Sequence, residues 1–554
     1  MDNVWKSFHR VDGQPTSKAT CNFCKSSVSS RVARLRKHME VCKSVPGSKS
    51  VPDVAPAPDM RVGSFAQRKV SSFVDVITRD QKRTMDYEVG RYIYSTNLPF
   101  SHVEHPRFQA FLSKLRPGYK PPTRQTIGST ILDDIYQDVV TKTQESLLRK
   151  QVTLMQDGWK ARTQDAVISH CLTTGEKAYF LNAVSAGENE KTAEYCVKLL
   201  QDAIQLAEDR YNVEVIAVVT DNCNSMRKMR RLLVEEKPDI LTYGCHPHLL
   251  NLVGKRLTPE CLQEKVEKVH KYFRNHDTAA ALLKKKNGTR PIMASSIRWN
   301  SWIRCFESYL KNQTKFLEVS RMDESRMANE DEIIDILNDR SLYRDVENTI
   351  GYLKPIQLAL DSLQKENATL ADGVSHWLSL QNSLVITDEK SKQYFEKQFE
   401  RAVTDVGIAA YMLNPKFKGN GLSTDLVDKG QRFLTAKTPF SIIIATQIQQ
   451  ESSAYFSKTL LSDAIVNGCT ALEWWQSVKA SEKVSSSVTD LAITLMKLPA
   501  GSADIERHFS TLGNIMNERR TRLGLPKAEK LCLIYKNLAG DNPPGHDGDD
   551  WFHK

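Results

Sequence analysis

The sequence lacks any apolar run of the roughly 20 residues that a membrane-spanning helix needs. The longest obvious apolar stretch, at 440–445, has the length of a buried segment. The first residues also lack the apolar region of a secretory signal. We therefore expect a soluble, intracellular protein that makes no membrane contact.

A disulfide framework is missing too. The 11 cysteines are odd in number and mostly dispersed over 554 residues, which points to a reducing compartment. No strong excess of one charge is present either. Lys and Arg number 77 and Asp and Glu 66, a net charge of +11 that permits a polyanionic partner without demonstrating one. No internal repeat is evident, and the length predicts roughly three or four domains.

Four residues near the N-terminus have the spacing of a zinc site. Cys21 and Cys24 form a Cys-x2-Cys pair, and His38 and Cys42 follow as His-x3-Cys. The second pair can share one face of a helix, so four ligands can converge tetrahedrally on Zn²⁺. A domain this small needs the metal to fold. Its expected apolar core consists of Trp5, Phe8, Phe23 and Leu35.

Basic residues flank this histidine and predict contact with DNA phosphates or base edges. They are Arg31, Arg34, Arg36 and Lys37. The alternative is a zinc module for protein contacts with a solvated charged face. Two further basic clusters, at 227–231 and 284–290, are candidates for a DNA path, although charge runs are usually solvated.

The rest of the chain predicts an α/β core and a large helical part. A Pro- and Ser-rich linker precedes helical patterns that reach residue 148. From about 246 to 495 the pattern is nearly all helical, either an insertion or a separate domain. Between these helical parts, strands are expected at 152–155, 166–172, 179–184 and 213–219, with a helix at 192–206.

Three acids stand in distinctive settings. Asp157 and Asp221 each close an apolar, strand-like run, whereas Glu506 lies on an amphipathic helical run. If the fold gathers them, their oxygens form a pocket suited to Mg²⁺ or Mn²⁺ and to phosphodiester chemistry. Simpler roles stay open: a turn at Asp157, a helix cap at Asp221, and an ion pair of Glu506 with Arg507.

Several motifs together resemble a transposase of the hAT (hobo and Activator) superfamily. They are Asp157-Gly158-Trp159, Thr220-Asp221-Asn222, Cys245-His246-Pro247-His248, Arg298-Trp299-Asn300-Ser301 and the Ser502–Ser510 block with its continuation to Leu538. The stretch Val4-Trp5-Lys6-Ser7-Phe8 ahead of the zinc spacing resembles a BED-type finger. The hAT resemblance covers most of the chain.

The resemblance implies an RNase H-like catalytic core, α/β in class, interrupted by a large all-helical insertion and preceded by a small zinc finger and a helical domain. Asp157, Asp221 and Glu506 match the family's DDE metal ligands, and His248 matches a histidine near the scissile phosphate. Arg298 and Trp299 match a DNA-contacting pair whose tryptophan stacks on a flipped base. Without the resemblance, Trp299 reads as a core residue, and Cys245 with His248 as a buried cysteine or half of a zinc site.

The resulting domain prediction runs along the whole chain. It comprises a BED-type zinc finger at 1–44, a flexible linker at 45–68, a helical DNA-binding or dimerisation domain at 69–148, the RNase H-like core at 149–256, the helical insertion at 257–495, the rest of the core with the hAT dimerisation region at 496–542, and a tail at 543–554.

The expected function is that of a cut-and-paste DNA transposase in the nucleus. Its partners would be double-stranded DNA, as terminal inverted repeats and as target, and further copies of itself. Mg²⁺ or Mn²⁺ would act at the DDE residues, and Zn²⁺ would hold the finger. Two alternatives stay open: a domesticated descendant that regulates transcription through zinc-dependent DNA binding, and a metal-dependent nuclease without strand transfer.

Overall fold

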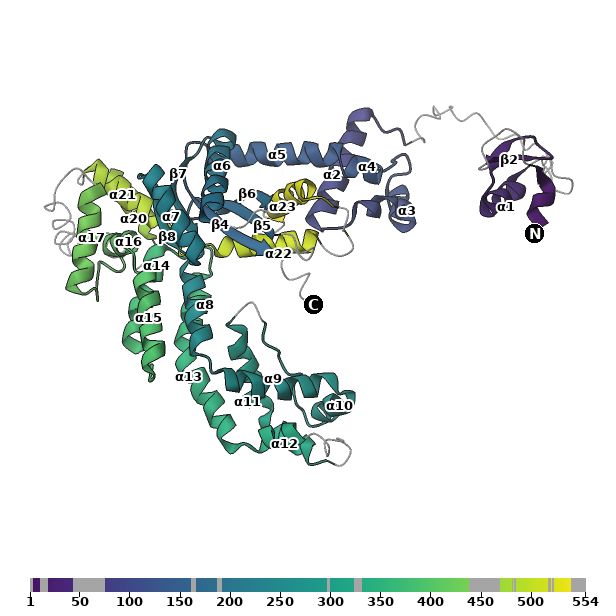
Figure 1. Cartoon of the computed structure of the whole chain (residues 1–554). Coiled ribbons are helices and arrows are strands. Elements are labelled where there is room, and N and C mark those ends of the chain that lie inside the picture. Colours follow the sequence, from purple (N-terminus) through teal and green to yellow (C-terminus); the bar gives the residue numbers. More distant parts are fainter. Residues whose placement is uncertain are drawn as a thin grey trace, which may run out of the picture. The chain divides into compact units, whose positions relative to one another are not determined.

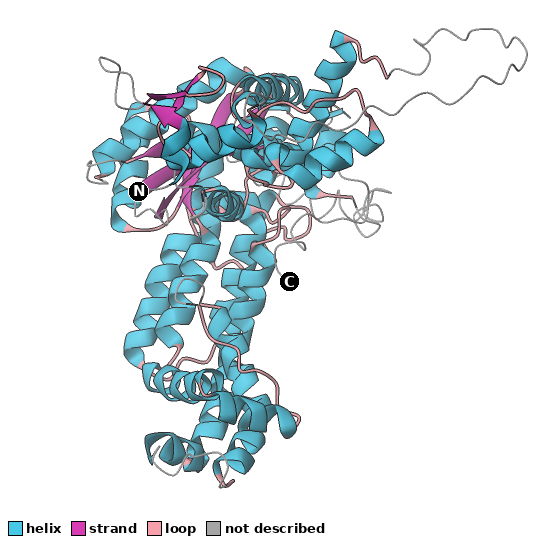
Figure 2. Ribbon diagram, turned by 90° about the vertical axis from the view of Figure 1, so that its right-hand side faces the viewer, coloured by secondary structure: helices cyan, strands magenta, loops and turns pink. Residues whose placement is uncertain are grey.

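The computed structural model describes most of the chain and divides it into two compact units, Met1–Val74 and Asp75–Lys554. None of the helices described is both long and apolar enough to span a bilayer. Most of the secondary structure is helical (Figure 2). The described residues are 3–9, 18–42, 75–160, 166–186, 192–295, 299–322, 331–437, 469–480, 482, 485–516, 520 and 523–539.

The first unit is a small antiparallel sheet with one helix. A short 3₁₀ helix (Asn3–Ser7) leads into β1 (Phe8–His9), which pairs with β2 (Lys18–Cys21), and β2 pairs with β3 (Ser27–Ser29). Helix α1 (Val32–Val41) closes the unit. Its buried core is Phe8, Ala19, Cys21, Leu35 and Cys42, with Trp5 packed against it.

The prediction that Phe23 belongs to the core of this unit is wrong. Phe23 is 38% exposed, because it lies in the turn between β2 and β3, where the chain reverses and little other chain is present to cover it.

The second unit begins with helices that join the main core. Long helices α2 (Arg79–Ser95) and α5 (Thr130–Leu147) pack against each other, and the shorter α3 (Pro106–Leu115) and α4 (Arg124–Ile127) lie between them in sequence. Thr78 starts α2 with a capping box, in which its hydroxyl accepts the N–H of Gln81.

A five-stranded sheet follows, and its order across the sheet is β6-β5-β4-β7-β8. The first three strands in sequence, β4 (Gln151–Lys160), β5 (Ala166–Thr173) and β6 (Ala178–Ser185), form an antiparallel meander. After helix α6 (Ala193–Tyr211), strand β7 (Glu214–Thr220) pairs parallel to β4. These elements confirm the expected strands and helix, except that β4 continues past its expected end at 155 to Lys160 and so includes Asp157. Helix α7 (Asn224–Glu236) then leads to β8 (Leu241–Gly244), which pairs parallel to β7 and was not predicted.

The sheet is covered by helices on both faces (Figure 1). His170 of β5 is within electrostatic range of Asp202 on α6. The next residue, Cys171, is instead within range of Asp504 on α22 (Ala503–Ile515) and Cys532 on α23 (Leu525–Ala539). Successive strand residues point to opposite faces, so one face meets α6 and the other meets α22 and α23.

The chain between β8 and α22 is helical wherever the structure describes it, apart from connecting turns and one isolated bridge. It contains two further hydrophobic cores beside the main one that includes the sheet. Its helices are α8 (His246–Leu257), α9 (Glu260–Asn275), α10 (Asp277–Lys285), α11 (Ser301–Ser320), α12 (Asp331–Asn338), α13 (Arg340–Leu363), α14 (Leu370–Ser383), α15 (Glu389–Ala402), α16 (Asp405–Leu413), α17 (Thr424–Lys437), α20 (Ala471–Ala480) and α21 (Ser486–Met496).

Candidate functional site

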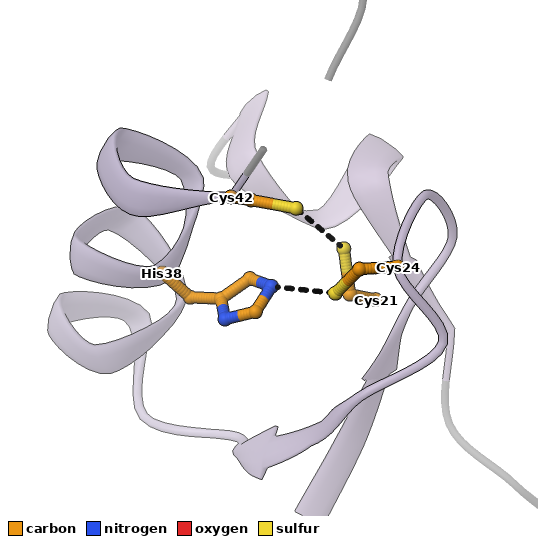
Figure 3. A group of neighbouring side chains, drawn as sticks. All are labelled: Cys21, Cys24, His38 and Cys42. Carbon is orange, nitrogen blue, oxygen red and sulfur yellow. Dashed lines mark hydrogen bonds between the residues drawn. The ribbon is translucent and has the colours of Figure 1, made fainter. Parts of the chain in front are cut away.

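The four predicted zinc ligands converge in the first unit (Figure 3). Their ligand atoms all lie within 4.8 Å of one another. The Sγ atoms of Cys21 and Cys42 are 4.0 Å apart, and Sγ of Cys24 is 3.2 Å from Nε2 of His38. Two thiolates on a tetrahedral Zn²⁺ are separated by roughly 3.8 Å, so the group fits zinc.

The local electrostatics favour a thiolate at this position. Sγ of Cys24 lies 3.1 Å from the Ser26 hydroxyl. This contact and the neighbouring cysteines lower the pKa of Cys24 to about 6. Zinc is bound by the thiolate form, so the group can form a Cys₃His zinc centre.

The four basic residues expected to meet DNA are all exposed. Arg31 precedes α1, and the other three lie on it near His38: Arg34, Arg36 and Lys37. They present cationic side chains to solvent next to the zinc ligands, and their contact with DNA stays a prediction.

The structure brings Asp157 and Asp221 onto neighbouring strands. Gln156 of β4 is paired with Thr220 of β7 in the parallel register. Asp157 is the next residue on β4, and Asp221 directly follows the end of β7. Paired residues on parallel strands face the same side of the sheet, so both aspartates project from one face.

Helix α22, which carries Glu506, packs on strands β4, β5 and β6. Its start is tied to the end of β8, because the Ser502 N–H donates to Sγ of Cys245 at 3.4 Å and the His246 N–H donates to the Ala500 carbonyl at 3.0 Å. Burial raises the pKa of Cys245 to about 11, and the nearby charge of Glu506 adds to the rise. Glu506 therefore lies at the end of the sheet where β7 and β8 finish.

The carboxylates of the three acids do not converge on one metal position in this structure. Within the described part of the chain, the Cys₃His group alone brings together three or more side-chain atoms able to bind one metal ion. The carboxylates instead accept local bonds: Asp157 from the Gly158 N–H at 2.7 Å, and Asp221 from the Cys223 N–H at 2.9 Å. The turn considered for Asp157 is not formed, because Asp157 and Gly158 are both paired within β4. Asp221 makes its bond just after the end of β7.

Arg507, which the sequence offers as a partner for Glu506, forms ion pairs with two other carboxylates. Arg507 pairs with Asp504 and lies 3.9 Å from Glu366. Burial raises the pKa of Asp504, and its bond to Arg507 opposes the rise. Asp504 is therefore committed to a structural pair, and Glu506 stays the expected metal ligand of the two.

A buried arginine holds the strand end that carries Asp221, and sequence reasoning missed it as a support. Arg230 of α7 donates to the Thr220 hydroxyl, the Asp221 carbonyl and the Asn222 side-chain oxygen. Burial lowers its pKa to about 10. Arg230 belonged to a basic cluster that was a candidate for a DNA path. For this residue the expectation is wrong, because its side chain is only 9% exposed.

Asn222 extends this network to the next strand. Its Nδ2 donates to the Cys245 carbonyl at 2.9 Å, and its side chain lies directly against Gly244. Cys245 is buried and His248, on α8, is partly exposed. A short chain of bonds thus joins the ends of β7 and β8 to the start of the helix that carries His248.

Ser169 is a second residue that the sequence did not single out. It is fully buried on β5 and directly opposite Asp157 in the antiparallel register. Its hydroxyl has no hydrogen-bond partner among the residues that the structure describes. Opposed side chains share one face of a sheet, so this hydroxyl is beside the first acid.

Two family models match the chain. Residues 122–271 match a domain of unknown function, DUF659, and residues 451–538 match the hAT family C-terminal dimerisation region. The first match spans the sheet with Asp157, Asp221 and His248, and the second includes Glu506. No curated protein matches the chain.

These matches indicate the hAT transposase family.

Membership of the hAT family suggests transposase activity, that is, a nucleic-acid-cleaving enzyme. The dimerisation region also suggests self-association. Many apolar side chains of the region that matches this model are already buried within the chain. Ile505 and Leu512 of α22 and Ile534 of α23 are fully buried in the main core. These apolar side chains of α22 and α23 therefore close the chain's own core.

The tryptophan of the expected DNA-contacting pair lies in the helical part of the hAT chain. Trp299 is 4% exposed. Its indole N–H donates to the Thr258 hydroxyl at 2.6 Å, and its ring lies against Gly254 of α8. Stacking on a DNA base stays a prediction and requires this ring to leave its present contacts. Arg298 lies outside the described residues.

Proposed function

We propose that this hAT-family chain is a cut-and-paste DNA transposase. It would bind transposon ends, cleave them with hairpin formation on the flanking DNA, and transfer the released 3′ ends into target DNA. The observation that carries the proposal is the common face of Asp157 and Asp221, on neighbouring strands, beneath the helix of Glu506. A nuclear location is proposed with it, because the substrate is genomic DNA.

The strand order supports an RNase H-like core for this activity. A three-stranded antiparallel meander is extended by two strands parallel to its first member, and helices cover both faces. The helical segment between β8 and α22 would then be the insertion.

The donor chemistry suits a hard divalent cation. Three carboxylates, Asp157, Asp221 and Glu506, would hold Mg²⁺ or Mn²⁺, since these ions prefer oxygen ligands. Such ions, when bound, activate the attacking hydroxyl and stabilise the leaving oxygen. Arg230 would keep the Asp221 backbone fixed, and His248 would lie near the scissile phosphate. The zinc centre with its exposed arginines would contact DNA outside the catalytic site.

A cleavage assay tests the proposal. The purified chain, with Mg²⁺ or Mn²⁺, is incubated with DNA that ends in the inverted repeats flanking its gene. We expect hairpinned flanks, and a loss of more than about 100-fold in Glu506→Gln, because removing a ligand costs more than removing its outer support. Asp504→Asn is the matched comparison and should retain cleavage.

Other outcomes would replace the proposal. Cleavage without end specificity or strand transfer would make the protein a metal-dependent nuclease. Tight, zinc-dependent DNA binding without any cleavage would make it a DNA-binding regulator. Equal loss in Asp504→Asn and Glu506→Gln, at unchanged thermal stability, would contradict the assignment of Glu506.

A further inference from the structure

Two arginines from distant parts of the chain lie within electrostatic range of each other, close to the strand end of Asp221. Arg227 is in the first turn of α7, which starts three residues after Asp221, and Arg401 is in the last turn of α15. Helix α15 packs against α8 and β8, which brings its end to this side of the sheet. Both side chains are partly buried. Burial and the nearby charge of Arg227 lower the pKa of Arg401.

Each of these guanidinium groups contacts a neutral partner. Nη2 of Arg227 donates to Oδ1 of Asn224 at 2.6 Å, and Nη1 of Arg401 donates to Oε1 of Gln398 at 3.1 Å. Within the described chain, Nε of Arg227 is shielded from solvent and has no acceptor. Two like charges within electrostatic range of each other, one with an unfilled buried donor, are unfavourable until an anion joins them.

Neighbouring basic residues of α7 are engaged elsewhere. Arg230 supports the Asp221 strand end through neutral acceptors, and Lys228 pairs with Glu194 at 2.5 Å. Arg227 instead bonds to the neutral Asn224, and its charge is within range of Arg401. The result is a small region of positive charge next to one of the candidate metal ligands.

We propose that Arg227 and Arg401 bind one backbone phosphate of DNA between them. The inference rests on the proposed function, since it takes DNA as the substrate. A planar guanidinium offers parallel N–H donors that match two phosphate oxygens, which a lysine cannot do. Two such groups from different helices would fix the position of a DNA strand relative to Asp221 without reading its sequence.

The test measures DNA binding by the full chain in a Glu506→Gln background, which removes cleavage from the readout. The affinity for one duplex is followed over a series of salt concentrations for Arg227→Ala, Arg401→Ala and the double variant. We expect each single variant to bind roughly tenfold more weakly and to lower the salt slope by about 0.9. The double variant should lose little more, because both side chains hold the same phosphate.

Matched controls separate this site from general charge effects and from misfolding. Lys397 is exposed on the same helix, one turn before Arg401, so Lys397→Ala removes equal charge without touching the pair. Arg401→Lys keeps the charge and should restore the salt slope but only part of the affinity. Contacts made by the zinc finger contribute equally to all variants and cancel in the differences.

Three results would overturn the inference. Arg401→Ala could match Lys397→Ala in affinity and slope, or the two single effects could add fully with a slope loss near two, as for separate phosphates. Inorganic phosphate could raise the melting temperature through these arginines while DNA binding stays unchanged, which would indicate a free-anion site. If the protein cleaves DNA but its DNA affinity does not depend on these arginines, the inference is wrong and the proposed function stands. If its DNA affinity depends on them but it does not cleave DNA, the inference stands and the proposed function is wrong.

Discussion

Gly254 of α8 is where the helical part of the chain accommodates the Trp299 ring. A β-carbon at this position would lie 2.3 Å from the nearest ring atom. A rigid indole that already donates to Thr258 cannot move aside cheaply. The Trp299 ring can therefore occupy its buried position because Gly254 has no β-carbon.

We expect Gly254→Ala to destabilise the protein by about 1–3 kcal/mol through overpacking. Gly351 of α13 is the matched control, because a β-carbon there meets nothing within 4 Å. Gly351→Ala should raise stability by about 0.5–1 kcal/mol, since it lowers the entropy of the unfolded chain. Thermal melts of both variants check the pair, and equal melting temperatures would contradict the account.

At the residue scale the sequence revealed side chains with distinctive chemistry and missed those that depend on pairing. The zinc ligands follow from spacing alone and do converge. The strand-end setting of Asp221 was also legible, whereas Asp157 lies inside β4, which continues to Lys160. Ser169 and the supporting role of Arg230 were not predicted. Ser169 matters because strand pairing places it opposite Asp157, and Arg230 matters because it bonds to the residues at the end of β7. Both relations depend on strand register and helix packing, which one sequence does not display.

Strand β6 is the edge of the five-stranded sheet, and side chains of two helices bond to two of its backbone groups. The Ala183 N–H donates to the Glu529 carboxylate of α23 at 2.5 Å. Arg210 of α6 donates to the Leu181 carbonyl at 3.3 Å. An open edge invites pairing with another chain, so these side chains protect the sheet. Burial raises the pKa of Glu529, and its bond to Ala183 opposes the rise.

Glu529→Ala should cost about 1–3 kcal/mol, because it leaves a buried N–H without an acceptor. Glu529→Gln keeps an oxygen in place and should cost less. Hydrogen exchange of the β6 segment measures the difference, with faster exchange expected in the alanine variant. Unchanged exchange in both variants would show that the edge is protected by packing alone.

At the element scale the starts of β4 and α6 were predicted to within one residue, but both elements continue five residues past their predicted ends, to Lys160 and Tyr211. Strand β8 was missed because it has only four residues, Leu241–Gly244, and carries no period of its own. Its place in the sheet comes from pairing with β7. Helix α7 was noticed for its charges, yet its hydrophobic face, with Met229 and Leu233 fully buried, makes it part of the core.

At the scale of the whole molecule, the two compact units differ in what stabilises them. The second unit has large hydrophobic cores, whereas the first has five buried core residues, and two of these are the predicted ligands Cys21 and Cys42. So few apolar contacts cannot offset the entropy of folding without a bound ion.

Removal of zinc should therefore unfold the first unit and leave the second folded. Hydrogen exchange with and without a chelator tests this, with full loss of protection expected over 18–42 and none over the sheet. Cys42→Ser should have the same effect without a chelator. Persistent protection of 18–42 in the metal-free protein would contradict the prediction.

The bond from Ser502 to Cys245 joins residues 257 positions apart in the chain. Ribosomes add about 5–20 residues per second, so roughly 10–50 s pass between the synthesis of β8 and that of α22. During this time α22 has not been made, so the sheet face that it covers is exposed. Asp157 and Asp221 are then present without Glu506. A nascent or truncated product consequently lacks the third acid, and cells must shield that apolar face until synthesis is almost complete.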